Sequence, residues 1–109
     1  LNIIQTNFEL GPFANQLGTN GWIESEWFGV FKPVSNQWLY HTRLGWIYFS
    51  PVDSKSFWFW MESHGWLWTK EGLWPFMWSH ASNGWLYLIG NQGMTFYNYE
   101  RQIWESSVE

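Results

Sequence analysis

The chain has 109 residues, of which 24% are aromatic and only 13% charged, with a formal net charge of −4 and no cysteine. This length is typical of one domain, and the lack of cysteine excludes disulfides and thiolate chemistry. Five Lys and Arg residues are too few to neutralise a phosphate backbone, so no nucleic-acid partner is expected. The sequence also lacks the run of about eighteen apolar residues that a membrane span requires.

Tryptophan is the most unusual feature of the composition. The chain contains twelve tryptophans, and each buried aromatic side chain removes roughly 150–250 Å² from water. A few of them would complete the core of a small domain, so the others are expected to lie partly exposed. Exposed aromatic clusters usually mark interaction surfaces, and the composition therefore predicts such a surface.

The first third of the chain is irregular. Gly11-Pro12 indicates a turn, and residues 27–31 form a short aromatic run that stops at Lys32-Pro33, which predicts one more strand. Repeat proteins need atypical units at their ends. We therefore interpret residues 1–36 as an N-terminal capping unit and residues 37–109 as the repeats of one compact domain.

From residue 37 onward the sequence repeats with a period of about twenty residues. Gly-Trp followed by an aliphatic residue and then Tyr or Trp occurs three times, beginning at Gly45, Gly65 and Gly84. A degenerate copy follows at Ile103-Trp104. A fixed period of this size is the signature of a repeat architecture.

Each repeat predicts a β-hairpin. A short aromatic run precedes a turn of three or four residues, and the turn leads through Gly into the Gly-Trp strand. The four aromatic runs lie at residues 38–41, 57–61, 76–79 and 96–99. The expected fold class is therefore all-β, an antiparallel meander of about four aromatic hairpin repeats with an irregular N-terminal cap. A solenoid, a sandwich and a closed barrel are all compatible with this pattern.

The Gly-Trp strands are expected to have two unlike faces, because side chains alternate across a strand. The aliphatic face is predicted to form the core; its residues are Ile47, Phe49, Leu67, Leu86 and Leu88. The opposite face is either a second core layer or a ladder of binding platforms; its residues are Trp46, Tyr48, Trp66, Trp68, Trp85 and Tyr87. With a three-residue turn Trp38 and Tyr40 join this ladder, whereas with a four-residue turn Leu39 and His41 do.

Over residues 38–107, the Gly-Trp dipeptide, the aromatic hairpin and the period resemble choline-binding and related cell-wall-binding repeats of secreted bacterial proteins. The resemblance implies stacked hairpins that hold quaternary ammonium or glycan ligands in aromatic cages. By this resemblance the cage candidates are Trp46, Trp66 and Trp85, with Trp60 and Trp68 nearby. The chain differs from that family because a strand follows Gly-Trp directly and both strands are aromatic. In this respect it is similar to Trp-rich C-terminal modules of proteins secreted by environmental bacteria.

Catalytic and metal-binding patterns are weak. Glu24 and Glu26 would share one face of a strand at a spacing compatible with a glycosidase pair, but many solvent-facing strands carry the same pattern. His41, His64 and His80 lie near predicted turns without the close pairing of metal ligands, so we expect polar turn residues. We predict no catalytic residue, no cofactor and no metal site, and we expect that the chain is not an enzyme.

The leading hypothesis is a carbohydrate-binding accessory module, secreted or at the cell surface as part of a longer protein. Its partner would be a polysaccharide or cell-surface glycan, whose sugar rings pack on Trp and Tyr. The expected ligand-binding residues are Trp46, Tyr48, Trp60, Trp66, Trp68, Trp85 and Tyr87. The candidate polar partners are Asn36, Gln37, Arg43, Asn83 and Asn98. One alternative is an anchoring or self-assembly module that uses exposed strand edges; another is a choline-type cation cage.

Overall fold

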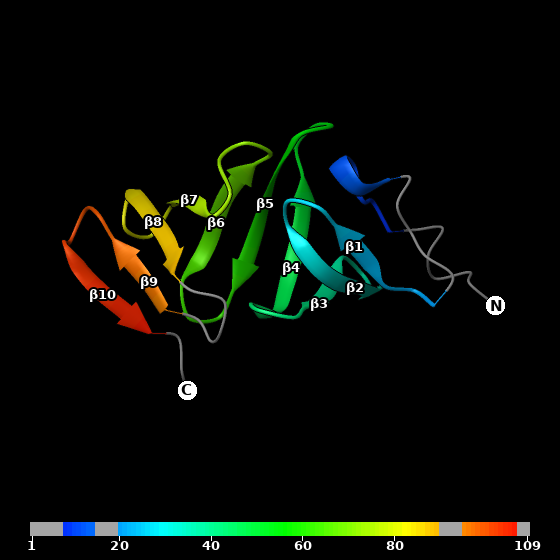
Figure 1. Cartoon of the computed structure of the whole chain (residues 1–109), viewed down its shortest axis with the longest axis horizontal. Helices are drawn as coiled ribbons and strands as arrows, with labels where there is room; N and C mark the ends of the chain where they lie inside the picture. The colour runs from blue at the N-terminus through cyan, green and yellow to red at the C-terminus, as the bar shows by residue number, and fades with distance from the viewer. Residues whose placement is uncertain (1–7, 15–19, 90–94, 107–109) are drawn as a thin grey trace.

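The computed structural model describes residues 8–14, 20–89 and 95–106. Ten antiparallel strands form one sheet in which each strand pairs with the next along the chain (Figure 1). They are β1 (Ile23–Ser25), β2 (Gly29–Ser35), β3 (Trp38–His41), β4 (Gly45–Pro51), β5 (Ser56–Met61), β6 (Gly65–Lys70), β7 (Phe76–Ser79), β8 (Gly84–Ile89), β9 (Thr95–Asn98) and β10 (Ile103–Ser106). The prediction of an all-β antiparallel meander is confirmed.

The N-terminal third contributes a hairpin of its own. β1 pairs with β2, and β2 continues through Pro33 to pair with β3, with a register shift between Pro33 and Ser35. Such an irregularity is expected where Pro removes a ladder donor. The prediction of a strand over residues 27–31 is correct for residues 29–31, which lie in β2, and wrong for Trp27 and Phe28, which form the β1–β2 turn. Before this hairpin, the 3₁₀ turn η2 (Gly11–Phe13) inserts the buried ring of Phe13 into the core.

The hairpin turns contain either three or four residues. The length depends on which residue of the turn adopts a positive φ. Three residues separate the terminal pairs of the β3–β4 and β5–β6 hairpins, whose second strands begin at Gly45 (φ 78°) and Gly65 (φ 71°). In the β7–β8 hairpin Asn83 takes the positive φ (54°) and four residues separate Ser79 from Gly84. Asn tolerates this conformation better than most residues, so the turn gains one residue.

The side chains that point to one face of the sheet form the core. This inner face carries the predicted aliphatic set Ile47, Phe49, Leu67, Leu86 and Leu88, each at most 2% exposed. Phenylalanine supplies much of the remaining volume; Phe13, Phe28, Phe31, Phe57, Phe59 and Phe96 are all buried. The prediction that the aliphatic face is the core is confirmed.

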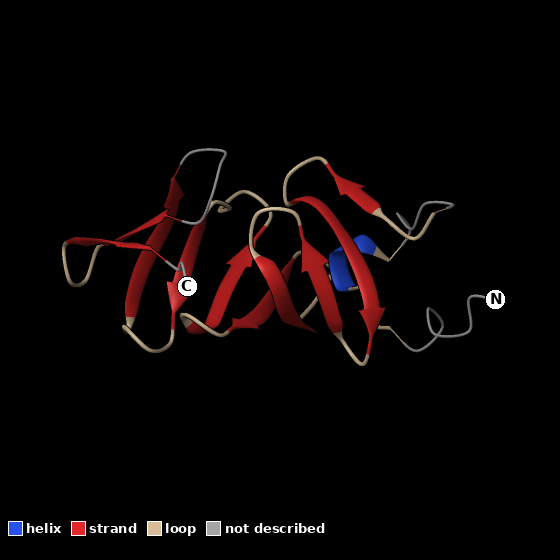
Figure 2. Cartoon of the chain, turned by 90° about the horizontal axis from the view of Figure 1, so that it is seen from below, coloured by secondary structure: helices blue, strands red, loops and turns tan. Residues whose placement is uncertain are grey.

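A single flat sheet would leave its inner face open to water, so the sheet must cover itself. It does so by coiling, and the β1–β2, β3–β4 and β5–β6 turns each contact a segment about two hairpins further along. Phe28 in the β1–β2 turn contacts Trp74, which follows β6, at 4.7 Å between ring centroids. Nη2 of Arg43, in the β3–β4 turn, donates to the carbonyl of Ile89 at 3.2 Å. The hairpins therefore wind along the 46 Å axis (Figure 2), with β1 and β10 at the two ends of the strand order.

A buried polar residue closes the first strand of four hairpins. Ser25, His41, Ser79 and Asn98 each accept hydrogen bonds from backbone N–H groups of the turn that follows. These contacts satisfy turn donors that the sheet ladder leaves unpaired. The β5–β6 hairpin differs, because the buried Met61 occupies this position.

His41 is the titratable member of this set. Its Nδ1 accepts from the N–H groups of Arg43 and Leu44, so its Nε2 carries the proton and donates to the Phe28 carbonyl at 2.7 Å. Burial lowers the pKa of His41 to about 4. His41 and His80 therefore differ in role, since His80 is exposed at the start of the β7–β8 turn. The prediction of a simple polar turn residue holds for His80 and fails for the buried His41.

Candidate functional site

The outer face of the sheet, opposite the core, carries rows of aromatic side chains. Each row crosses neighbouring strands at paired positions. The first row is Lys32, Tyr40 and Trp46; the second is Trp38, Tyr48, Trp60 and Trp66; the third is Ser50, Trp58, Trp68, Trp78 and Trp85; the fourth is Phe76, Tyr87, Tyr97 and Trp104. The ring of Trp22 extends the first row, with Nζ of Lys32 5.9 Å from its centroid.

Successive rows are staggered along the strands. β6 contributes Trp66 to the second row and Trp68 to the third, and β8 contributes Trp85 to the third row and Tyr87 to the fourth. The first row begins on β2, the second on β3, the third on β4 and the fourth on β7. Because the sheet coils, the rows form one continuous aromatic strip that follows the coil.

Within each row at least one pair of neighbouring rings meets edge to face or at a tilt. Trp38 and Tyr48 lie 5.4 Å apart at 76°, and Trp78 and Trp85 lie 5.4 Å apart at 80°. This geometry is favourable for aromatic quadrupoles. In this geometry a ring contacts its neighbour while part of its surface remains accessible to water. Trp46 is 55% exposed and Trp66 is 37% exposed. The outer face is thus a surface of supported, half-exposed rings.

All seven sequence-predicted ligand-binding residues lie on the outer face. Trp46, Trp66 and Trp85 are exposed, and the others are partly buried; those others are Tyr48, Trp60, Trp68 and Tyr87. The three-residue β3–β4 turn also brings Trp38 and Tyr40 onto this face, one of the two arrangements that the sequence left open. The four-residue β7–β8 turn likewise brings Phe76 and Trp78 to this face. The sequence signal for this longer turn is the pair Asn83-Gly84, whose Gly is the first residue of β8.

The candidate polar partners are mostly engaged in holding the fold. Gln37 bonds to the backbone of Glu9 and to the Phe49 carbonyl, and Asn98 is buried. Arg43 bonds to Ile89 as described above. Asn36 and Asn83 are exposed and occupy turn positions with positive φ. Gln37, Arg43 and Asn98, which the sequence suggested as polar partners of a ligand, therefore bond to the chain itself.

Among the hollows that the described residues line, two shallow ones on the outer face have mainly aromatic walls. The first, of about 320 Å³, is lined by Ser50, Trp58, Trp66 and His80. The second, of about 510 Å³, is lined by Leu73, Phe76, Trp85 and Tyr99. Neither lining contains a carboxylate, a Lys or an Arg. Both hollows therefore offer aromatic surface to an uncharged ligand, and the first adds a hydroxyl and an imidazole as hydrogen-bonding groups.

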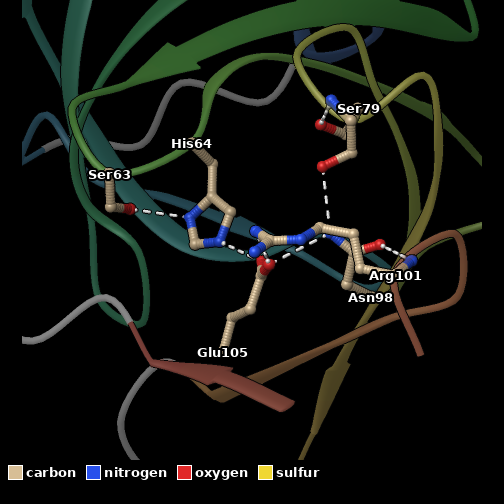
Figure 3. Close-up of polar contacts among 7 residues, drawn as sticks. Ser63, His64, Ser79, Asn98, Arg101 and Glu105 are labelled. Atoms are coloured by element: carbon tan, nitrogen blue, oxygen red, sulfur yellow. Dashed lines mark hydrogen bonds and ion pairs between the residues drawn. The ribbon is translucent and has the colours of Figure 1, made fainter. Parts of the chain in front are cut away.

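A polar network lies apart from these hollows, where the β5–β6 turn meets β10 (Figure 3). Oε1 of Glu105 accepts from Nε2 of His64 at 3.1 Å, so Nδ1 of His64 accepts from the Ser63 hydroxyl at 2.8 Å. Oε2 of Glu105 accepts from Asn98 and from Arg101 at 3.1 and 3.0 Å. A hydroxyl, an imidazole and a carboxylate in line have the connectivity of a hydrolase triad. Here the carboxylate is also the junction of two hairpins, and we interpret the network as structural.

Replacing Glu105 with Ala is expected to lower the free energy of unfolding by roughly 1–3 kcal/mol, because His64 and Asn98 then lose a charged acceptor. Urea denaturation of both proteins measures this difference. Glu62→Gln is the control, since Glu62 is exposed in the same β5–β6 turn as His64. Equal stability of the Glu105 variant and the original protein would show that the network does not hold β10 to the turn.

The weaker catalytic and metal candidates are not brought together. β1 ends at Ser25, so Glu26 lies in the turn and does not share a strand face with Glu24 as predicted. Within the described ranges, no three His, Asp or Glu side chains are grouped closely enough to hold a metal ion. In the same ranges, no helix has the length and apolar character for crossing a membrane.

Comparison with known proteins gave no match to a family model, a curated protein or a solved structure.

Proposed function

We propose that this protein is a non-catalytic module that binds a neutral polysaccharide on its outer aromatic face. The observation that carries this proposal is the way in which the aromatic residue types are sorted. Eight of the nine Phe residues are buried, whereas none of the twelve Trp and five Tyr residues is. A layer needed only for packing could consist of Phe and Leu, so the sorting calls for another reason.

Trp and Tyr differ from Phe by a polar group at the end of an apolar ring. This combination suits a half-wet site, in which the ring packs against an apolar surface and the N–H or O–H reaches a polar partner. Sugar rings offer both features, because their C–H faces are apolar and their hydroxyls donate and accept. The half-exposed rings of the outer face match that chemistry along the whole strip.

Charge favours a neutral ligand over an acidic one. The chain has a formal net charge of −4, which disfavours association with sulfated or uronic polysaccharides. The two hollows are lined by uncharged side chains apart from the titratable His80. An uncharged glycan would therefore meet no unpaired charge there, whereas burying a charge without a partner is costly.

Replacing Trp66 and Trp68 together with Ala is expected to abolish measurable polysaccharide binding, because the double substitution removes platforms from two adjacent rows. Pull-down on cellulose and chitin and affinity electrophoresis in soluble neutral glucans measure the effect. Val52→Ala is the control, since Val52 is exposed in the β4–β5 connector and belongs to no row. Circular dichroism verifies that each variant is folded, and unchanged binding in a folded double variant contradicts the proposal.

The same samples discriminate the two alternative functions. A choline-type cage would be displaced by choline through cation–π competition, whereas polysaccharide binding would not. A self-assembly module would show a sedimentation coefficient that rises with protein concentration. One observation favours testing this second alternative: β10 lies at the end of the strand order and carries Trp104, which is 60% exposed. Sedimentation independent of concentration would leave the polysaccharide proposal in place.

A further inference from the structure

The two hollows are built from equivalent positions of successive repeats. Trp66 and Trp85 are the tryptophans of two consecutive Gly-Trp motifs, and they are 37% and 38% exposed. The N–H of His80 donates to the Trp66 carbonyl at 3.1 Å, and the N–H of Tyr99 donates to the Trp85 carbonyl at 2.9 Å. In each hollow the same backbone contact therefore places a side chain of the following turn beside the repeated tryptophan.

A third residue of each hollow also occupies an equivalent position in its repeat. Trp58 on β5 lines the first hollow and Phe76 on β7 lines the second, each from the strand that precedes the Gly-Trp strand of its own hairpin. The two hollows therefore repeat as a unit of three residues. They differ at the fourth position, where Ser50 supplies a hydroxyl to the first hollow and Leu73 supplies apolar surface to the second.

The sheet register sets the distance between the two hollows. Trp85 lies in the same row as Trp68, which is two strands away, and Trp68 is two residues from Trp66 along β6. Two strand spacings across and two residues along correspond to about 12 Å. A ligand that occupies both hollows must therefore present similar chemistry at that interval.

We infer that the two hollows are successive copies of one subsite and that a single extended, neutral polysaccharide chain occupies both at once. This inference rests on the function proposed above and adds the mode of binding. A polymer of sugar residues repeats the same ring chemistry along its length, whereas a small molecule or a single headgroup does not. The ring pair Trp66 and Trp58 packs on one portion of the chain, and the pair Trp85 and Phe76 packs on the next.

Simultaneous occupation has a measurable signature. When one chain reaches both hollows, the second contact becomes intramolecular, and such linkage raises affinity by about 10²–10⁴-fold without a new kind of contact. Short oligosaccharides, which reach one hollow, are expected to bind weakly. Longer ones are expected to bind at least about 100-fold more tightly, with the increase at the length that spans both hollows.

The experiment is titration calorimetry with two oligosaccharide series, cello-oligosaccharides and chito-oligosaccharides, each from the disaccharide to the hexasaccharide. Trp66→Ala removes the first hollow and Trp85→Ala removes the second. Each substitution is expected to reduce hexasaccharide affinity by a similar factor, at least tenfold, and to flatten the dependence on chain length. His80→Ala and Tyr99→Ser test the same two hollows from exposed turn positions if a tryptophan variant fails to fold. Val52→Ala is again the control.

The outcomes separate this inference from the function on which it rests. Length-dependent binding that both variants weaken supports the two linked subsites. If only one of the two variants loses affinity, or if affinity does not depend on chain length, the two hollows are not linked subsites, although the protein still binds polysaccharide. No binding of either series to the unmodified, folded protein, together with no retention on cellulose or chitin, overturns both.

Discussion

The variant Phe28→Ala is expected to lose about 3–5 kcal/mol of unfolding free energy, the usual cost of removing a fully buried aromatic side chain. Phe28 is 1% exposed and lies in the turn between β1 and β2. Its ring meets Phe57 on β5 at 4.9 Å, Trp74 at 4.7 Å and His41 at 4.5 Å. One side chain therefore joins the first hairpin to the second and third and to the connector before β7.

The size of this loss matters because small domains are stable by only about 5–15 kcal/mol. Thermal melting followed by near-ultraviolet circular dichroism and urea denaturation measure it. The matched control is Phe76→Ala, the same chemical change at a Phe that is 38% exposed on the outer face. We expect that variant to lose much less. Equal losses in the two variants would mean that Phe28 does not close the coil as its contacts indicate.

Stability is expected to fall as the pH is lowered from about 6.5 to about 4, because of His41. The pKa of His41 is lowered from 6.5 to about 4 by burial, so the unfolded chain takes up a proton in this range and the folded chain does not. The favourable contribution of the neutral imidazole is complete above pH 6.5 and is lost on going down to pH 4. With about 1.4 kcal/mol for each pH unit, the loss amounts to about 3 kcal/mol.

The matched variant is His41→Asn, because Asn98 occupies the equivalent position in the β9–β10 hairpin and accepts from the N–H of Arg101. This substitution retains an acceptor for the turn and removes the titrating group. Urea denaturation at several pH values between 4 and 7 should give a shallower slope for the variant than for the original protein. Identical slopes in this range would assign the pH dependence to other groups. The substitution also removes the packing of the imidazole ring. This lowers the free energy of unfolding by the same amount at every pH between 4 and 7, so it does not change the slope of stability against pH.

The local sequence pattern predicted the strands and their two faces because both depend on neighbouring residues. Alternation across a strand is fixed by backbone geometry, so Ile47 and Leu67 were separable from Trp46 and Trp66 without knowledge of the fold. The Gly-Trp period likewise located the turns. The prediction failed at Trp27 and Phe28, where apolar residues with high β propensity form a turn because Gly29, with φ 106°, begins the next strand.

Turn length was within reach of the sequence but needed one further signal. Leu44 and His64 precede Gly45 and Gly65, and there glycine takes the positive φ. Asn83 precedes Gly84 and takes that conformation itself, which lengthens the turn and moves Phe76 and Trp78 to the outer face. Asn-Gly is a preferred residue pair in hairpin turns. The longer β7–β8 turn therefore follows from the preference of this one pair.

The sequence by itself determined the hairpins, the core face and the aromatic outer face, because each depends on residues within about one repeat. The tertiary structure alone decided the coil, the hollows and the buried state of His41. Those features depend on contacts between different hairpins, and the coil includes contacts as distant in sequence as Arg43 with Ile89 and His64 with Glu105. Such contacts form only where the twist accumulated over several strands brings a turn onto a later hairpin. A pattern of single residues does not encode that accumulated twist, whereas packing of the whole sheet fixes it.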